Sequence, residues 1–320
     1  METLIYINGA LVPEQDAKVS IFDIGFMYSA VFMEALRTFK HKLYRLEDHL
    51  ERLERSLRYA GVESLISGRE MGDVIQQVLD ANISQFEESD DCWVCAQVTP
   101  GLGFPQPLIK GSASKKPTVI AYVSPLPYDE YAKCYTKGKA AVISTVRNVP
   151  ASVVDPRAKT RFRLHYFMAK LGIAALDPDA FALLLDTDGY VSEGTGANIF
   201  IVSNGQLFTP TTRNILEGIS RRTVIELAQE LQIPVSERDL TPYDIYTADE
   251  GFWTTSSFCL LPLPRVNHRS IGNRVPGPIT EKILNAWSAK VGVDIVGQAM
   301  KYAHRKSNVW RGAPAVLQGP

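Results

Sequence analysis

Two glycine turns divide residues 181–210 into short apolar strands, and this pattern constrains the fold more than any other feature of the chain. The stretch reads FALLLDTDGYVSEGTGANIFIVSNGQLFTP, with Asp188-Gly189 and Asn204-Gly205 between apolar runs. Such pairs favour the tight turns of β-hairpins, because Gly, Asp and Asn tolerate positive φ angles. The second half of the chain is therefore expected to contain a mostly antiparallel sheet.

The first half of the chain mixes strand and helix signals. YINGALV predicts a hairpin about Asn8-Gly9, and strands are expected around Trp93 and over 117–123. Between them, EDHLERLERSLRYAGV repeats leucine at helical spacing and ends at Gly61, which suits a helix C-terminus. A further helix is expected over 72–84. This half therefore predicts an α+β domain.

The boundary between the halves is expected at PYDEYAKCYTKGK, where the pattern breaks. We predict a two-domain chain of the α+β or α/β class. Its parts are a smaller N-terminal α+β domain over 1–125, an interdomain linker over 126–137, a larger C-terminal domain over 138–300 and a C-terminal extension over 301–320. The extension is basic and then rich in Pro and Gly, which is typical of a loosely held terminus.

Composition excludes several classes of function. With 320 residues and 45% hydrophobic content, the chain can bury a sizeable core. Its 34 Lys and Arg balance 35 Asp and Glu, so no long-range field favours nucleic acid or an anionic membrane. The first residues lack a leader pattern, and no run approaches the roughly 18 apolar residues of a membrane helix. A cytoplasmic protein is expected.

Cys92 and Cys95 form a C-x-x-C motif within DDCWVCAQVTP, which raises the question of redox chemistry. The Trp and Val between them predict a strand, in which residues three apart face opposite ways. We therefore expect two thiols that do not pair, and we expect no metal site.

A basic stripe lies in DPRAKTRFRLHY, where Arg157, Lys159, Arg161 and Arg163 occupy every second position. It could bind a polyanion, or the lysine could be a nucleophile with the arginines as its surroundings. A lysine attacks a carbonyl only when its amine is partly neutral, which burial or neighbouring cations promote. If the segment stays extended past Lys159, the arginines share its face; a helix starting near Thr160 would splay them apart.

Three other segments carry polar groups that suit one cofactor. In LEGISRRTVIELA, Gly218 precedes Ile219 and Ser220 at a helix start, where N–H groups and a hydroxyl can bind phosphate, although plain capping by Ser220 explains this segment equally well. GFWTTSSFCL places hydroxyl residues at 254–257, after an apolar strand. Glu193 precedes two glycines, where a carboxylate can face a ligand. Together with a reactive lysine, these are the groups that bind pyridoxal phosphate.

The order of these motifs resembles the class IV aminotransferases, the fold-type IV pyridoxal-phosphate group. That group contains branched-chain, D-amino-acid and (R)-amine transaminases and aminodeoxychorismate lyase. The resemblance covers roughly residues 5–297 and rests on YINGALV, FDIGFMYSAVFMEALRTF, RLEDHLERL, LLLDTDGYVSEGTGANIFIV, ILEGISR and FWTTSSFCLLPL. It implies a D-amino-acid-aminotransferase-like fold, with a cofactor-binding C-terminal domain.

The resemblance also implies roles for single residues. Lys159 corresponds to the Schiff-base lysine that moves the substrate proton, Glu193 to the carboxylate that pairs with the pyridinium nitrogen, and Arg52 to the phosphate-binding arginine. The other implied cofactor contacts are Leu216 on the ring face and, around the phosphate, Gly218, Ile219, Ser220, Thr255 and Ser256.

Several positions depart from the branched-chain enzymes. The tyrosine usual five residues after the lysine is Leu164, as in D-amino-acid transaminases and the lyase. Trp93-Val94-Cys95 replaces a Tyr-x-Arg, which removes an arginine that would help to fix a carboxylate, and Met33 replaces an aromatic residue. Another group must then orient the substrate. The candidates for substrate contact are Tyr28, Met33, Arg37, Trp93, Arg161, Arg163 and Ser257.

The implied reaction is ping-pong transamination between an amino acid or primary amine and a 2-oxo acid, catalysed by a homodimer. The donor and its stereochemistry stay open. One alternative is a lyase of the aminodeoxychorismate type, which releases pyruvate. Another, from a different class, is a non-catalytic ligand-binding homologue.

Overall fold

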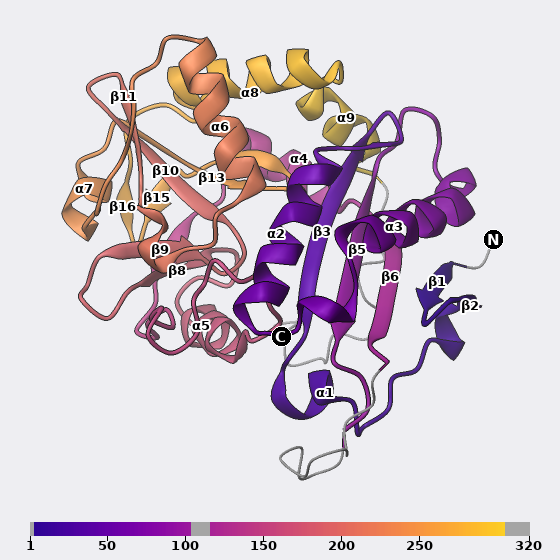
Figure 1. Cartoon of the computed structure of the whole chain (residues 1–320). Coiled ribbons are helices and arrows are strands. Elements are labelled where there is room, and N and C mark those ends of the chain that lie inside the picture. The colour runs from indigo at the N-terminus through magenta and orange to yellow at the C-terminus, as the bar shows by residue number, and fades with distance from the viewer. Residues whose placement is uncertain (1–2, 104–115, 305–320) are drawn as a thin grey trace. The chain divides into compact units, whose positions relative to one another are not determined.

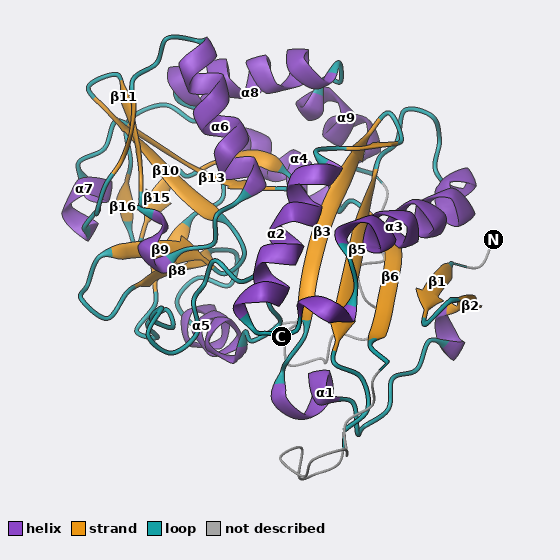
Figure 2. Cartoon of the chain, in the orientation of Figure 1, coloured by secondary structure: helices purple, strands orange, loops and turns teal. Residues whose placement is uncertain are grey.

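The chain divides into two units, each with its own sheets and helices. The N-terminal unit comprises Met1–Leu126 and Ala158–Arg163, and the C-terminal unit comprises Pro127–Arg157 and Leu164–Pro320. The computed structural model describes residues 3–103 and 116–304 (Figure 1). Both units mix helices with sheets, which confirms the predicted α+β character (Figure 2).

The N-terminal unit contains one six-stranded sheet. Its strands lie in the order β2 (Ala10–Pro13), β1 (Leu4–Ile7), β6 (Thr118–Pro125), β5 (Cys92–Thr99), β3 (Phe32–Phe39) and β4 (Lys42–Leu43). The predicted hairpin about Asn8-Gly9 is confirmed, since β1 pairs with β2 and both turn residues have positive φ. Every other strand pair in this sheet is also antiparallel.

The N-terminal unit also contains three α-helices and three short 3₁₀ helices in its described part. They are η1 (Glu14–Asp16), α1 (Ile24–Tyr28), α2 (Leu46–Tyr59), η2 (Glu63–Leu65), α3 (Gly68–Asn82) and η3 (Ile83–Gln85). Helix α3 begins four residues earlier than expected because Ser67 and Glu70 form a capping box, in which each side chain bonds the other's backbone N–H.

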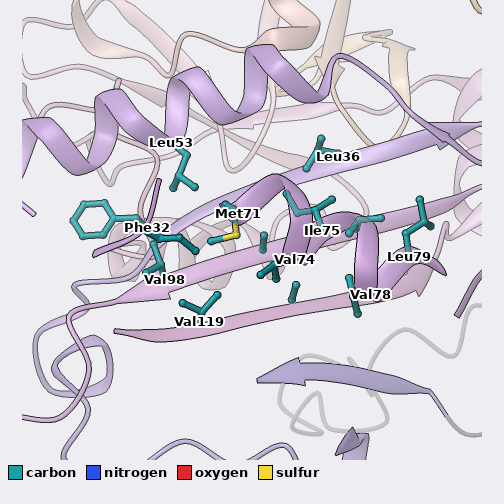
Figure 3. Packing of buried hydrophobic residues seen from close by; sticks show 14 of the residues in the cluster. Phe32, Leu36, Leu53, Met71, Val74, Ile75, Val78, Leu79, Val98 and Val119 are labelled. Carbon is teal, nitrogen blue, oxygen red and sulfur yellow. The ribbon is translucent and has the colours of Figure 1, made fainter. Parts of the chain in front are cut away.

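The core of the N-terminal unit lies on one face of the sheet. Alternate residues of β3 and β5, including Phe32, Leu36 and Val98, pack against apolar residues of α2 and α3 such as Leu53 and Ile75 (Figure 3). The opposite residues of the same strands, among them Met33, Ala35 and Cys95, form a separate small cluster with Trp93 and Tyr122. Strand alternation therefore gives this sheet an aliphatic face against the helices and a second face that carries polar groups.

Two five-stranded sheets form the framework of the C-terminal unit. The first is ordered β12 (Val235–Glu237), β11 (Gln206–Thr209), β10 (Asn198–Ser203), β13 (Glu250–Thr255) and β14 (Cys259–Pro262). The second is ordered β16 (Arg269–Ser270), β15 (Arg265–Val266), β7 (Ala141–Ile143), β8 (Phe181–Leu185) and β9 (Val191–Gly194). Most pairs are antiparallel as predicted, and both glycine turns join neighbouring strands. The exceptions are β11–β12, β7–β8 and β7–β15.

Helices complete the C-terminal unit. They are α4 (Tyr128–Lys137), α5 (Leu164–Ala174), η4 (Thr212–Asn214), α6 (Ile219–Glu230), α7 (Pro242–Tyr246), α8 (Pro278–Val291) and α9 (Ile295–Tyr302). Among the residues that the structure describes, no helix is both long and apolar enough to cross a membrane.

The structure differs from the predicted boundaries in two places. The expected linker over 126–137 is mostly the helix α4. Asp129 and Glu130 lie in its first turn and Lys137 lies in its last turn, so their charges interact favourably with the helix dipole and stabilise the helix. Residues 158–163 belong to the N-terminal unit rather than to the second domain, because their backbone bonds to the chain at the start of β3. Of the expected extension over 301–320, residues 305–320 lie outside the described ranges.

Candidate functional site

Lys159 is held on both sides of its backbone within the N-terminal unit. Its carbonyl accepts a hydrogen bond from Met33 N–H at 3.1 Å, and its N–H donates to the Ser56 hydroxyl of α2 at 3.0 Å. Thr160 forms an isolated antiparallel bridge with Phe32, at the start of β3. The lysine therefore continues the sheet in an extended conformation, with its backbone position fixed by two elements.

A buried ionic network lies on α2 and β3. The Arg52 guanidinium donates from Nε to Glu34 Oε1 at 2.8 Å and from a terminal nitrogen to Oε2 at 2.7 Å. His49 Nδ1 lies 2.7 Å from the same Oε2 and must donate to it, because an ionised carboxylate only accepts. All three side chains are at most 3% exposed. The bidentate pair with Glu34 thus fixes the orientation of the Arg52 guanidinium without the help of a ligand.

The charges of this network follow from its geometry. Burial alone would raise the pKa of Glu34, but the paired Arg52 and the hydrogen bonds from Arg52 and His49 hold it well below its usual range. Burial lowers the pKa of His49, against the opposing effect of Glu34, and the charges of Arg52 and Lys159 lower it further. The Lys159 ammonium therefore lies within electrostatic reach of this network.

Glu193 of β9 is a buried carboxylate in the C-terminal unit. The Tyr166 hydroxyl of α5 donates to its Oε1 at 2.7 Å. The Asn198 side-chain amide donates to Oε2 at 3.1 Å, and Leu216 N–H donates to the same oxygen at 3.2 Å. Asn198 also donates to the Leu216 carbonyl, so it links the carboxylate to the loop that precedes α6. These bonds fix the orientation of a carboxylate that is 3% exposed.

The N-terminus of α6 lies beside this carboxylate group. Gly218 occupies the N-cap position and offers no side chain to the first helical N–H groups. A Cβ at Gly218 would lie 2.1 Å from Asn198 Oδ1, so only glycine fits there. Ile219 and Ser220 open the helix and are both buried. The positive end of a twelve-residue helix is therefore positioned through the same Asn198 that holds Glu193.

The predicted row of hydroxyls lies at the end of β13 and in the turn after it. Asn198 of β10 pairs in register with Thr254 of β13. Thr254 itself donates to the Cys259 carbonyl at 2.6 Å and so closes the turn. Thr255, Ser256 and Ser257 follow it and stay partly exposed. Thr254 therefore has a structural role, whereas the next three hydroxyls are accessible.

These groups fit a phosphorylated pyridine cofactor. A phosphate suits the Gly218–Ser220 helix start and the hydroxyls of 255–257. A pyridinium nitrogen suits the oriented Glu193 carboxylate, which can only accept hydrogen bonds while it is ionised. Within the C-terminal unit, Asn198 links three of the predicted cofactor residues, namely Glu193, Leu216 and Gly218. Ile219 and Ser220 follow Gly218 in α6, and Thr255 and Ser256 follow Thr254, the partner of Asn198 in the sheet.

Four of the substrate candidates lie on the polar face of the N-terminal sheet. Met33, Trp93 and Arg161 all lie on the polar face of the sheet, around Cys95. Arg37 faces the same way but is 2% exposed, donates to the Thr38 carbonyl and lies over the Phe39 ring.

The remaining arginines of the basic stripe point to local partners. Arg157 forms an ion pair with Asp155, and Arg163 Nε donates to the Thr160 carbonyl at 3.2 Å. The stripe is therefore no continuous basic surface.

The last two substrate candidates lie elsewhere. Tyr28 lies in α1 with 52% of its surface exposed, and Ser257 belongs to the C-terminal unit.

The cysteines are confirmed as unsuited to redox pairing. Cys92 packs into the helix-covered core and Cys95 lies in the cluster on the opposite face, and both are free. Burial raises the pKa of Cys92 to about 12 and also raises that of Cys95. Neither thiol is a ready nucleophile at neutral pH.

Sequence reasoning missed the groups that hold the predicted residues in place. Glu34 and His49 orient Arg52, Ser56 fixes the Lys159 backbone, and Tyr166 and Asn198 hold Glu193. Glu34 could have been found from the sequence, because a carboxylate within the apolar run VFMEAL is expected to be buried and then needs a cation or a hydrogen-bond donor as its partner.

Comparisons with known proteins agree on one family. The profile of Amino-transferase class IV matches residues 31–266. A Methanocaldococcus jannaschii protein, provisionally named a branched-chain-amino-acid aminotransferase, is 36% identical over 90% of this chain and 98% of its own length. The D-alanine aminotransferase of Bacillus licheniformis is 28% identical over 88% of this chain and 95% of its own. The solved T.th. branched-chain amino acid aminotransferase with pyridoxamine 5'-phosphate has a TM-score of 0.78 and 27% identity, and covers 94% of this chain and 97% of its own.

Proposed function

Because the chain belongs to the class IV aminotransferases, we propose that it is a pyridoxal-5'-phosphate-dependent transaminase that uses Lys159 as its reactive amine. The observation that carries the proposal is the buried Glu193, which Tyr166, Asn198 and the Leu216 N–H fix beside a helix N-terminus. A carboxylate and a phosphate-binding helix start, held by one asparagine, match the two ends of this cofactor.

Each polar group then has one task. Arg52 and the Gly218–Ser220 helix start would bind the phosphate, with help from Thr255 and Ser256. Glu193 would keep the pyridinium nitrogen protonated, and Leu216 would pack on the ring. When bound, the cofactor supplies an electron sink that stabilises the charge left as a proton leaves the substrate carbon. Lys159 Nζ would carry that proton, and the extended backbone at 159–161 would aim it.

The proposed reaction moves an amino group from an amino acid or primary amine to a 2-oxo acid in two half-reactions. The family relatives named for branched-chain amino acids and for D-alanine leave the donor open. Separate half-reactions with L-amino acids, D-amino acids and (R)-amines, followed by the absorbance of the bound cofactor, would identify it. Release of pyruvate from aminodeoxychorismate without any amino acceptor would instead favour the lyase alternative.

Replacement of Lys159 by Ala tests the assignment directly. The variant should lose the visible absorbance of lysine-bound cofactor and at least about 10³-fold in kcat, because the general base and the covalent attachment are both removed. Lys42→Ala is the matched control, since Lys42 is an exposed lysine of the same unit. A Lys159→Ala protein that kept full turnover would exclude this assignment.

We also propose that the active form is a homodimer. Leu164, Phe167, Met168 and Leu171 follow one another at helical spacing along α5 and are 66%, 46%, 51% and 40% exposed. The other side of α5 buries Ala169 and Ile173 in the core. A helix that is apolar on both sides needs a cover on its outer side, and a second copy of the chain is the proposed cover.

A further inference from the structure

Arg161 is a cation on the polar face of the N-terminal sheet. Its N–H donates to the Val31 carbonyl at 2.9 Å, and Thr160 opposes Phe32. Directly opposed residues of antiparallel strands share a face, so Thr160 faces the helix-covered core with Phe32. Residues on either side of Thr160 then point the other way, which places the side chains of Lys159 and Arg161 together on the polar face.

The partners of the Arg161 guanidinium are all neutral. Nε donates to Gln97 Oε1 at 3.3 Å, and one terminal nitrogen lies 3.5 Å from Cys95 Sγ and 3.4 Å from the Tyr122 hydroxyl. In the described part of the chain no Asp or Glu pairs with it. A partly buried guanidinium without a counter-ion is costly unless an anion arrives, since long contacts to neutral groups compensate little of its lost hydration.

The same face carries a second donor, the indole N–H of Trp93. Trp93 stands opposite Arg37 on β5 and packs with Cys95, two residues further along the strand. Its indole Nε1 is buried and has no hydrogen-bond partner among the described residues. A buried N–H without an acceptor is rare, so beside Cys95 the unpartnered Trp93 N–H lies on the same face as a guanidinium that has only long contacts to neutral groups.

We infer that Arg161 binds a carboxylate of the substrate. This inference deepens the proposed function and rests on it, because every transamination of the proposed kind brings at least one carboxylate, that of the 2-oxo acid, to Lys159. Arg161 lies two residues from Lys159 on an extended segment, so their Cα atoms are about 6–7 Å apart on one face. A planar guanidinium offers the parallel donors that a carboxylate accepts.

The other arginine candidates are less suited. Arg37 is almost fully covered and its guanidinium lies 4.3 Å from the Phe39 ring centroid. Arg163 directs Nε to the Thr160 carbonyl, and it follows the end of the extended stretch, just before α5 begins. Arg161 combines the face of Lys159 with partial exposure and with neutral side-chain partners among the described residues.

The test compares Arg161→Gln and Arg161→Lys with the wild-type holoenzyme. Titration calorimetry measures the dissociation constants of hexanoate and glutarate, and steady-state assays measure KM for pyruvate and 2-oxoglutarate. The Gln variant should weaken carboxylate binding by about 10- to 100-fold, the range expected for a lost charge-assisted pair. The Lys variant should show a smaller loss, because it keeps the charge but not the fork.

Two comparisons separate this role from a structural one. A primary amine without a carboxylate should keep its KM in Arg161→Gln, and Arg157→Gln should behave like the wild type, since Arg157 is an exposed arginine of the same stripe paired to Asp155. Loss of glutarate binding alone would assign Arg161 to a distal carboxylate. Loss for both acids would assign it to the carboxylate that all substrates share.

Carboxylate dissociation constants within twofold of the wild type in Arg161→Gln would overturn the inference. So would an equal rise in KM for the amine, which would indicate a structural role. If the Gln variant does not fold, the Lys variant decides by the same comparison. A wild-type protein that binds glutarate through Arg161 but neither absorbs as a cofactor complex nor transaminates would refute the proposed function and leave carboxylate binding intact.

Discussion

Replacement of Glu34 by Gln would break the buried network that orients Arg52. The carboxylate accepts two bonds from Arg52 and one from His49, and its side chain is fully buried. A glutamine of the same shape has one acceptor oxygen and one NH₂ group. Whichever way the amide turns, its NH₂ group faces an N–H of Arg52, so a buried guanidinium loses its counter-ion and meets a donor.

The expected cost follows from that geometry. Removing one partner of a buried ion pair costs about 3–5 kcal/mol, because the other charge stays buried without compensation. For a unit of about 130 residues this corresponds to a fall in Tm of roughly 10–20 °C. Phosphate affinity should fall as well, because the pair that aims Arg52 is gone.

Urea denaturation followed by circular dichroism measures the change. Glu51→Gln is the matched control, since Glu51 is an exposed glutamate of the same helix and should stay within about 0.5 kcal/mol of the wild type. A loss below about 1 kcal/mol in Glu34→Gln would refute the argument, because a network worth so little could not fix Arg52.

The pH dependence of stability gives a second readout of the same network. The pKa of Glu34 is lower in the folded chain than its ordinary 4.5, so its contribution is complete above that pH and declines as the pH falls further. Burial lowers the pKa of His49 below 6.5, so the unfolded chain takes up its proton first and stability also falls below that pH. The difference in the free energy of unfolding between the wild type and Glu34→Gln should therefore become smaller as the pH falls below 4.5.

Three further substitutions test the C-terminal unit. Gly218→Ala should weaken cofactor binding by about tenfold or more, because its Cβ would lie 2.1 Å from Asn198 Oδ1 and displace the helix start; fluorescence titration with the cofactor measures this. Tyr166→Phe should raise the cofactor dissociation constant by about 10- to 100-fold through the lost bond to Glu193, measured in the same titration. Leu171→Glu should shift the protein towards monomer in sedimentation velocity, because it charges the exposed apolar side of α5.

Matched controls keep these tests specific. Gly172→Ala should leave cofactor binding unchanged, since no atom lies within 4 Å of the added Cβ on α5. Tyr243→Phe alters a 74% exposed tyrosine and should behave like the wild type. An unchanged cofactor titration in Gly218→Ala or Tyr166→Phe, or an unchanged sedimentation coefficient in Leu171→Glu, would contradict the corresponding argument.

Local chemistry in the sequence was enough to predict much of the fold. The Asn8-Gly9, Asp188-Gly189 and Asn204-Gly205 turns all lie between paired strands. The glycine of each pair has a positive φ, which the residue itself permits without help from the rest of the chain. Periodicity located α2 and α3 of the N-terminal unit to within a few residues. It failed at α4, where turn-like residues and a helix could not be distinguished, and at 158–163, whose partner strand lies over a hundred positions earlier.

The sequence by itself determined which local patterns offer polar groups, and it predicts the site residues Lys159, Glu193, Arg52 and the Gly218–Ser220 helix start from them. Only the tertiary structure decided how those groups are held, because Glu34, Ser56 and Tyr166 come from other strands and helices. It also decided among the arginines of the stripe. The chain stays extended through Arg161 and turns helical at Leu164, and that single boundary places Arg161 beside Lys159. Strand register is a property of two segments at once, so neither segment alone could reveal it.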